Sequence, residues 1–236
     1  MSGHSKWSKV KHQKTTSDAV KSTAFTKASR AITVAAREGG GITDPARNFR
    51  LRLAMENARA VNMPKETIVR AVERATASSD NLEPFVYEGY GPGGVAVIIE
   101  GVTDNKQRTA AAIKHLFDRF GGSLAGPGAV GHLFSRIGAL DITKSTDSDT
   151  MLGLALVSGA EDIEEENDRY WVYTTDSSLH AVSEKLREVG MHIRSQKLIY
   201  VPRERLTLSP EVAHQASELV NQLRDSDDVT DVATNL

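Results

Sequence analysis

Cationic side chains are concentrated at the amino-terminal end of this chain. Residues 1–16 are basic and polar without an apolar period, and we expect them to form an arm that orders on binding. Lysines bind phosphate groups by releasing counterions, and an exposed tryptophan among them can stack on an unpaired base. Together with cations of the first predicted helix, these residue types predict a nucleic-acid-binding site made of His4, Lys6, Trp7, Lys9, Lys11, His12, Lys14, Lys27, Arg30 and Arg37.

A solvated tail is the alternative interpretation of the arm, with Trp7 packed back on the helices that follow. The charge distribution favours the nucleic-acid site. Residues 1–78 contain 15 Lys and Arg against six Asp and Glu, a net charge of +9, whereas the remaining residues contain 14 against 25, a net charge of −11. A basic segment joined to an acidic body is typical of a protein that places one end on a polyanion. We expect the acidic body to stay clear of that contact.

Four more arginines belong to the second predicted helix: Arg47, Arg50, Arg52 and Arg59. Because successive helical positions face different directions, they cannot all share one contact surface. The sequence shows no helix with a clear set of base-reading side chains. We therefore expect readout of the phosphate backbone and of shape rather than tight sequence specificity.

A glycine cluster at residues 89–94 formally satisfies the pattern GxGxxG. A dinucleotide site needs that pattern to open a helix, and here it precedes the apolar segment VAVIIEGV, which predicts a strand. The simplest interpretation is a turn that joins two strands. The functional interpretation is a tight loop that approaches a nucleic acid, and a second loop at residues 121–128 has the same character. The loop contacts would come from Tyr90, Gly91, Gly93 and Gly94.

Residues that could support catalysis are isolated from one another. The histidines stand alone, and the chain contains no GxSxG, HExxH or phosphate-binding P-loop pattern. Cysteine is absent, which excludes disulfides and thiolate metal ligands and fits a reducing compartment. We predict a cytoplasmic protein that is not an enzyme and has no catalytic residue, metal site or cofactor. No apolar run is long enough for a membrane span, and the sequence leaves the oligomeric state open, with a monomer among the options.

Residues 1–78 are predicted to form a three-helix domain. The first helix begins at Asp18 and is stopped by the triplet at residues 39–41. We expect a second helix from Asp44, with Pro45 in its first position, and a third that opens at Pro64. A polar linker follows at residues 78–83.

The rest of the chain alternates strands and helices. Strands are predicted at 95–102 and near 130–134, with a helix at 105–119 between them. Residues 137–201 have the order β-α-β-β-α-β of a ferredoxin-like unit, and a helix at 210–224 and a strand at 229–234 end the chain. The segment 84–134 lacks its second helix and last strand, which the tail can supply. We predict a multi-domain α and α+β protein, with a three-helix domain followed by two ferredoxin-like α+β domains, one inserted in the other. The domains are 1–78, 79–134 plus 205–236, and the inserted 135–204.

Several short sequence motifs resemble those of the YebC/PmpR family. They include GHSKW at residues 3–7, the segment Asn62-Met63-Pro64, and YEGYGPGG at residues 87–94. Further motifs are Thr103-Asp104-Asn105 with Arg108-Thr109, and GGSL at residues 121–124. The resemblance runs along the whole chain and is densest over residues 1–134.

This resemblance implies three domains and no enzymatic reaction. Members of the family are described as probable transcriptional regulators that bind DNA, mitochondrial relatives as translational activators, and a role in relieving ribosome stalls at proline-rich stretches is also attributed to the family. The basic surface would carry over to His4, Lys6, Trp7, Lys11, His12, Lys14 and Lys27. Between Lys14 and Phe25 the only cation is Lys21, where many relatives carry a dense basic cluster, and this difference weakens nonspecific affinity.

We predict that the protein does not bind a membrane and that its partner is a nucleic acid. Two hypotheses follow from this prediction, and a third keeps a protein partner open. The first is a transcriptional regulator that binds DNA through its basic amino-terminal domain. The second is a ribosome-associated translation factor that binds rRNA or tRNA. The third is a protein–protein interaction module in which the acidic domains bind a partner and the arm only localises the molecule.

Overall fold

The computed structural model describes residues 18–77 and 82–236. They divide into two compact units, of which one comprises residues 136–201. The other unites the amino-terminal helices with residues 82–135 and 202–236. Within the described ranges, no helix combines the length and the apolar character that a membrane crossing requires.

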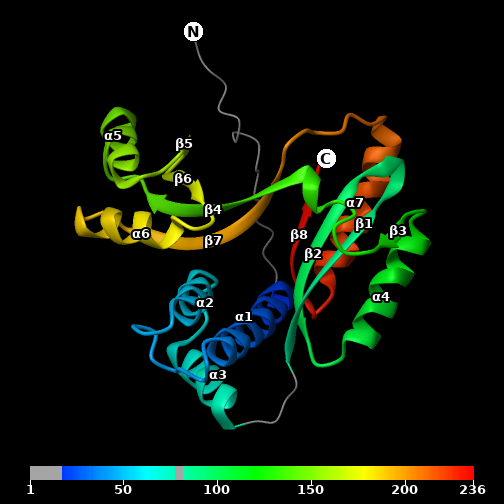
Figure 1. Cartoon of the computed structure of the whole chain (residues 1–236), viewed down its shortest axis with the longest axis horizontal. Helices are drawn as coiled ribbons and strands as arrows, with labels where there is room; N and C mark the ends of the chain where they lie inside the picture. The colour runs from blue at the N-terminus through cyan, green and yellow to red at the C-terminus, as the bar shows by residue number, and fades with distance from the viewer. Residues whose placement is uncertain (1–17, 78–81) are drawn as a thin grey trace. The chain divides into compact units, whose positions relative to one another are not determined.

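Three helices form the amino-terminal part: α1 (Asp18–Glu38), α2 (Phe49–Ala60) and α3 (Lys65–Ala77) (Figure 1). Their buried faces meet in a small core that includes Ile32, Leu51 and Ile68, each almost completely removed from solvent. The Thr33 hydroxyl, buried on α1, donates a hydrogen bond to the Ala71 carbonyl at 3.3 Å. The helices are therefore held by apolar packing and by a polar contact between α1 and α3.

The predicted start of the second helix at Asp44 and Pro45 is wrong. Asp44 caps only a turn, because its side chain accepts the Ala46 N–H at 2.9 Å. The helix begins at Phe49 with Asn48 as its N-cap. The Asn48 side chain accepts the Leu51 N–H and donates Nδ2 to the carbonyls of Ala35 and Ile42, each at 3.0 Å. These tertiary hydrogen bonds of a buried side chain determine where α2 starts.

The discontinuous part of the larger unit is a sheet covered by two helices. Its elements are β1 (Glu83–Tyr90), β2 (Ala96–Thr103), α4 (Lys106–Arg119), β3 (Ser123–Ala125), α7 (Pro210–Asp225) and β8 (Val229–Thr234). The strands follow the spatial order β3-β1-β2-β8, and each neighbouring pair is antiparallel. Strand β8, from the end of the chain, thus pairs with β2, from its middle.

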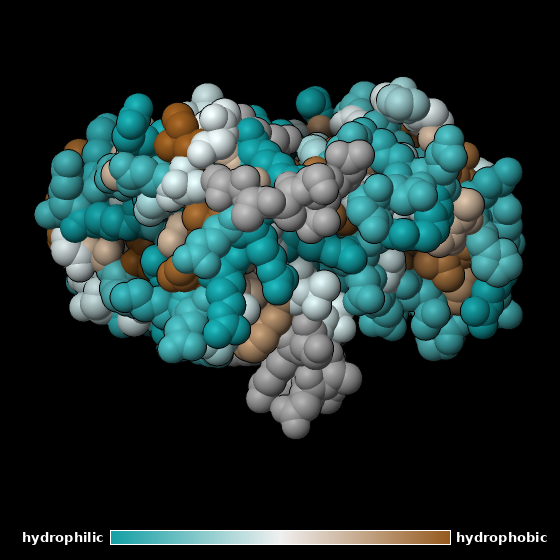
Figure 2. Space-filling view, turned by 90° about the horizontal axis from the view of Figure 1, so that it is seen from below, coloured by the Kyte–Doolittle hydropathy of each residue, from teal (hydrophilic) through white to brown (hydrophobic). Residues whose placement is uncertain are grey.

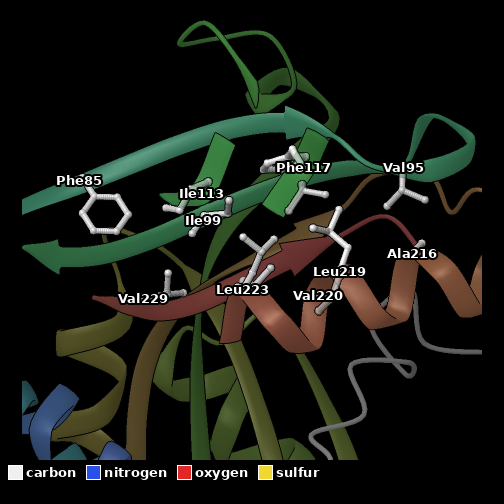
Figure 3. Close-up of a cluster of buried hydrophobic side chains, with 12 residues drawn as sticks. Phe85, Val95, Ile99, Ile113, Phe117, Ala216, Leu219, Val220, Leu223 and Val229 are labelled. Carbon is white, nitrogen blue, oxygen red and sulfur yellow. The ribbon is translucent and has the colours of Figure 1, made fainter. Parts of the chain in front are cut away.

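One apolar core joins these distant segments. Ile99 of β2, Phe117 of α4 and Leu223 of α7 are fully buried in it, and Figure 3 shows side chains from all three elements meeting between helix and sheet. The predicted return of the tail to this sheet is therefore seen in the structure. The short strand β3 falls in the second glycine-rich segment, where we expected only a loop.

The smaller unit contains β4 (Phe134–Thr143), α5 (Ser148–Ser158), β5 (Asp162–Glu166), β6 (Arg169–Thr175), α6 (Leu179–Glu188) and β7 (Ile193–Pro202). This β-α-β-β-α-β order is the predicted ferredoxin-like one, and the strands lie in the order β5-β6-β4-β7. Leu140, Tyr170 and Leu186 are buried in its core.

The multi-domain α+β class is confirmed. In the discontinuous part the elements follow the order β-β-α-β-α-β, so its chain path differs from that of the inserted unit. The division into three domains with boundaries at 78, 134 and 204 stays a prediction. The strand expected near 130–134 is wrong, because residues 131–133 form a 3-10 turn and β4 begins at Phe134.

The shared core leads to a prediction about truncated chains. A fragment of residues 1–134 should fail to fold cooperatively, because it lacks Leu219, Leu223 and Val229 from the core. A chain in which a short Gly/Ser linker replaces residues 136–201 should fold, because the Arg203 N–H donates to the Leu133 carbonyl at 2.9 Å and the two ends of the gap therefore lie close together. Thermal unfolding followed by circular dichroism tests both. A sigmoidal transition of the 1–134 fragment would contradict the discontinuous arrangement.

Candidate nucleic-acid interface

Most of the predicted arm cannot be located on the fold. His4, Lys6, Trp7, Lys9, Lys11, His12 and Lys14 lie outside the described residues. Their assignment to a nucleic-acid site stays a prediction. The structure places the other three predicted cations, Lys27, Arg30 and Arg37, on helix α1.

Lys27 reaches the last turn of α7, and Arg30 reaches the acidic turn between α7 and β8. The Lys27 ammonium donates to the Arg224 carbonyl at 2.5 Å. Arg30 donates Nη1 to the Asp228 carboxylate at 2.5 Å and to the Asp227 carbonyl at 3.0 Å. The acidic part of the chain, which we expected to stay clear of the contact with a polyanion, provides the partners of these two cations.

Burial is the main influence on the Lys27 ammonium. It lowers the pKa of Lys27, although the nearby carboxylates of Asp225, Asp227 and Asp231 act to raise it. Arg37, at the end of α1, donates Nε to the Ala75 carbonyl of α3 at 3.3 Å. All three predicted cations of α1 therefore make contacts within the protein.

Asp228 is the centre of a polar cluster. Besides Arg30, its carboxylate accepts the Thr109 hydroxyl at 2.6 Å and lies 3.5 Å from Arg108 Nη2. Its side chain is 12% exposed. Burial acts to raise the pKa of Asp228, but the hydrogen bonds from Thr109 and Arg30, with the charges of Arg30 and Arg108, outweigh it and lower the pKa. The carboxylate therefore stays charged and links α1 to α4.

The other side of this cluster is formed by the sequence motif Thr103-Asp104-Asn105 with Arg108-Thr109. Asn105 is the N-cap of α4 and accepts the Arg108 N–H at 3.0 Å, while the Asn105 N–H donates to the Thr103 hydroxyl. Arg108 forms an ion pair with Asp104 at 2.5 Å. The motif therefore has a structural role: it begins helix α4 and presents Thr109 to Asp228.

Other cations of the helical segment face solvent. The side chains of four of them make neither a hydrogen bond nor an ion pair with any residue in the described part of the chain, and each is exposed: Arg47, Arg59, Lys65 and Arg70. Of these, Lys65 and Arg70 were not identified from the sequence, because their charge alone does not distinguish them from paired arginines. In the view of Figure 2, hydrophilic side chains cover most of the visible surface. Arg47, predicted on the second helix, lies in the turn before α2, while Arg59 is on α2 and Lys65 and Arg70 are on α3. We call these four residues the α2–α3 cations.

The first glycine loop packs against α7. Residues 92–94 form a short 3-10 turn in which Gly93 and Gly94 have φ of 68° and 79°. A Cβ atom at Gly93 would come within 2.7 Å of Val212 Cγ1, and one at Gly91 within 3.2 Å of Leu219 Cδ2. Gly93 is therefore required both by its left-handed backbone and by the approach to α7. This is the role of a packed turn between β1 and β2.

The end of the second glycine loop and the residues that follow it fold around a carboxylate of β1. Glu88 on β1 accepts the backbone N–H groups of Gly128, Val130 and Gly131 at 2.8, 2.7 and 2.7 Å. The Tyr90 hydroxyl donates to the Ala129 carbonyl at 2.9 Å. Because the N–H groups at 130 and 131 are bound to Glu88, no strand forms there. A contact of Tyr90, Gly91, Gly93 or Gly94 with nucleic acid stays a prediction.

The Glu88 carboxylate has a perturbed titration. Burial acts to raise the pKa of Glu88, but the three backbone hydrogen bonds and the nearby His132 outweigh it and lower the pKa.

Among the described residues, no three His, Cys, Asp or Glu side chains are grouped so that they could hold a metal ion.

The Arg30–Asp228 pair leads to a prediction about stability. Asp228→Asn should lower the free energy of unfolding by about 1–3 kcal/mol, because a partly buried guanidinium loses its charged acceptor. A double-mutant cycle with Arg30→Met should show positive coupling between the two positions. The matched control is the exposed pair Lys106–Glu83, whose disruption should have little effect. Urea denaturation measures these values, and additive effects at positions 30 and 228 would contradict the link.

The Glu88 contacts lead to a prediction about pH. A folded-state pKa below the unfolded one adds stability above the unfolded pKa of 4.5, and this stability is lost as the pH falls through the folded value. Glu88→Gln should therefore cost about 1 kcal/mol near pH 7. The difference from the unmodified protein should disappear in more acidic solution, below the lowered pKa. Chemical denaturation at several pH values measures it, and a pH-independent difference would exclude the charge as its cause.

In a comparison with known proteins, two models of one protein family together match nearly the whole chain. Residues 5–78 match the family model described as the TACO1/YebC protein N-terminal domain, and residues 82–236 match the TACO1/YebC second and third domain. A protein from Thermotoga petrophila is 44% identical over 239 residues, which cover 100% of this chain and 93% of that protein. One from Acidithiobacillus ferrooxidans is 43% identical over 100% of this chain and 94% of the relative. Both are named probable transcriptional regulatory protein.

A solved structure has the same fold. The crystal structure of a conserved hypothetical protein from Aquifex aeolicus superimposes with a TM-score of 0.86 at 35% sequence identity. The match covers 97% of this chain and 95% of that one.

Proposed function

Because the chain belongs to the TACO1/YebC family, we propose that it is a regulator of gene expression that binds nucleic acid through its basic amino-terminal segment. The observation that carries the proposal is the separation of charge, with a net of +9 in residues 1–78 and −11 in the rest. The relatives named probable transcriptional regulatory protein favour DNA and a role in transcription. The proposal includes no catalytic step and places the protein in the cytoplasm.

Phosphate contacts within the described residues would come from the α2–α3 cations. Lys27 is held by the last turn of α7 and Arg30 by the turn between α7 and β8, so they would have to leave their partners to bind a phosphate group. Arg47, Arg59, Lys65 and Arg70 have no such cost, because no described side chain or carbonyl competes for them. The arm of residues 1–16 would add lysines to the same contact.

Structured RNA on the ribosome is the second target that this surface could bind. The α2–α3 cations offer charge without a set of base-reading side chains, and such a surface suits backbone and shape recognition. Duplex DNA and structured RNA both present phosphate to it. Mobility shift on duplex DNA and co-sedimentation with ribosomes, both at physiological salt, distinguish the two targets.

An interaction with a protein partner is a separate candidate function, and helix α5 favours it. Leu152 and Leu156 are exposed and lie four residues apart, which is the spacing of one helix face, and the adjacent Val157 is 85% exposed. Exposed apolar groups at such spacing are typical of interaction surfaces. Failure to bind either DNA or ribosomes would favour this interpretation over nucleic-acid binding.

The α2–α3 cations provide the test of the proposal. The triple variant Arg59→Ala, Lys65→Ala, Arg70→Ala should bind nucleic acid more weakly. The slope of log affinity against log salt should fall by about one for each phosphate group that the variant no longer binds. Lys114→Ala, which removes an exposed cation of α4 from the acidic part of the chain, is the matched control and should change neither value. An unchanged slope in the triple variant would remove α2 and α3 from the interface.

A further inference from the structure

A hollow of about 340 Å³ lies in the larger unit, beside the two connections that lead into β4 and out of β7. This volume is at the lower end of the range for small-ligand sites. Its residues come from three separate stretches of the chain: His132, Leu133, Arg203, Glu204, Arg205, Leu206 and Asn235.

Backbone hydrogen bonds hold these stretches together. The Arg203 N–H donates to the Leu133 carbonyl at 2.9 Å, and the Leu206 N–H donates to the Asn235 carbonyl at 2.7 Å. The walls of the hollow are therefore tied to one another by main-chain contacts rather than by flexible side chains. These main-chain contacts fix the backbone positions from which the polar side chains extend.

Three side chains that line the hollow carry hydrogen-bond donors: Arg203, Arg205 and Asn235. Arg203 donates Nε to the Phe134 carbonyl at 3.4 Å, so its guanidinium group is anchored by backbone. Arg205 donates to an oxygen of Leu236 and has a further interaction within the described chain. Asn235 accepts the Ala96 N–H at 2.9 Å through Oδ1, which leaves its Nδ2 as a donor. Within the described residues, neither Nδ2 of Asn235 nor the Nη atoms of Arg203 have an acceptor.

The electrostatic setting makes Arg203 unusual. Residues 82–135 and 202–236 contain seven Lys and Arg against 12 Asp and Glu. No carboxylate among the described residues forms an ion pair with Arg203. An anchored guanidinium without a carboxylate, in an acidic unit, has the geometry and charge to bind an anion.

We propose that this hollow binds a phosphate group, with the Arg203 guanidinium as its charged contact and the Asn235 amide as a second donor. A planar guanidinium fork suits two phosphate oxygens, and the volume admits a phosphate with an attached sugar. The phosphate can belong to a polynucleotide backbone or to a free nucleotide. The first source rests on the proposed function, whereas the second does not.

Glu204 places a negative charge in the same hollow and should oppose the binding of phosphate. Its carboxylate lines the same hollow between the two arginines in sequence. Because like charges repel, the Glu204 carboxylate should weaken the affinity for phosphate. Glu204→Gln should therefore bind phosphate more tightly, opposite in direction to Arg203→Ala.

Isothermal titration of the full chain with inorganic phosphate, AMP and a single-stranded oligonucleotide tests the site. Arg203→Ala should weaken binding about tenfold or more, which is the scale of removing one hydrogen bond to a charged group. Arg203→Lys should restore part of it, Glu204→Gln should strengthen it, and Lys114→Ala should leave it unchanged. Thermal melting shows whether each variant is folded, and Glu204→Gln retains the test if Arg203→Ala is not.

The pattern over the three ligands identifies the source of the phosphate. Dependence on Arg203 with AMP or inorganic phosphate assigns a site for a free phosphate, even if the chain binds no polynucleotide and the proposed function fails. Dependence on Arg203 with the oligonucleotide alone assigns the site to a polynucleotide backbone. Equal affinity of Arg203→Ala, Glu204→Gln and the unmodified protein for every ligand would overturn the site, while binding of the oligonucleotide would still support the proposed function.

Discussion

The carboxylate of Asp228 is the contact on which the larger unit depends. It receives Arg30 from α1 and Thr109 from α4, and the carbonyl of the same residue accepts the Val102 N–H of β2 at 2.8 Å. This approach requires Gly101, because a Cβ there would lie 2.1 Å from the Asp228 carbonyl oxygen. A partly buried carboxylate costs little only when charged donors surround it. One residue near the end of the chain thus joins the helical segment to the sheet.

A second carboxylate organises the glycine-rich segments by the same physical means. Glu88 collects three backbone N–H groups from residues 128–131, and a carboxylate with several such donors is held in its charged form. Glycines allow the backbone to fold closely around it. Packing and hydrogen bonding therefore explain the most distinctive motif of the sequence, YEGYGPGG. Recognition of a ligand is not required to account for it.

Charge in this protein therefore has two uses. Cations that meet carboxylates or carbonyls of the same chain, such as Lys27 and Arg30, hold the fold together. The α2–α3 cations have no such partner among the described residues, and Arg203 uses only Nε, so its Nη atoms are available to an external anion. Net charge describes the sum of the two sets and does not separate them. The separation follows from which side chains lie within reach of an acceptor.

The sequence by itself determined the three amino-terminal helices, the element order of the inserted unit, the return of the tail to complete the first sheet, and the basic character of the amino-terminal segment. Apolar periodicity and capping residues carry that information locally. Only the tertiary structure decided that α2 starts at Asn48 rather than at Asp44, that Glu88 prevents a strand at 130–131, and that Lys27 and Arg30 face inward. In each case the deciding partner lies far along the chain or on another element. A hydrogen bond between distant residues leaves no period or spacing in the sequence from which it could be read.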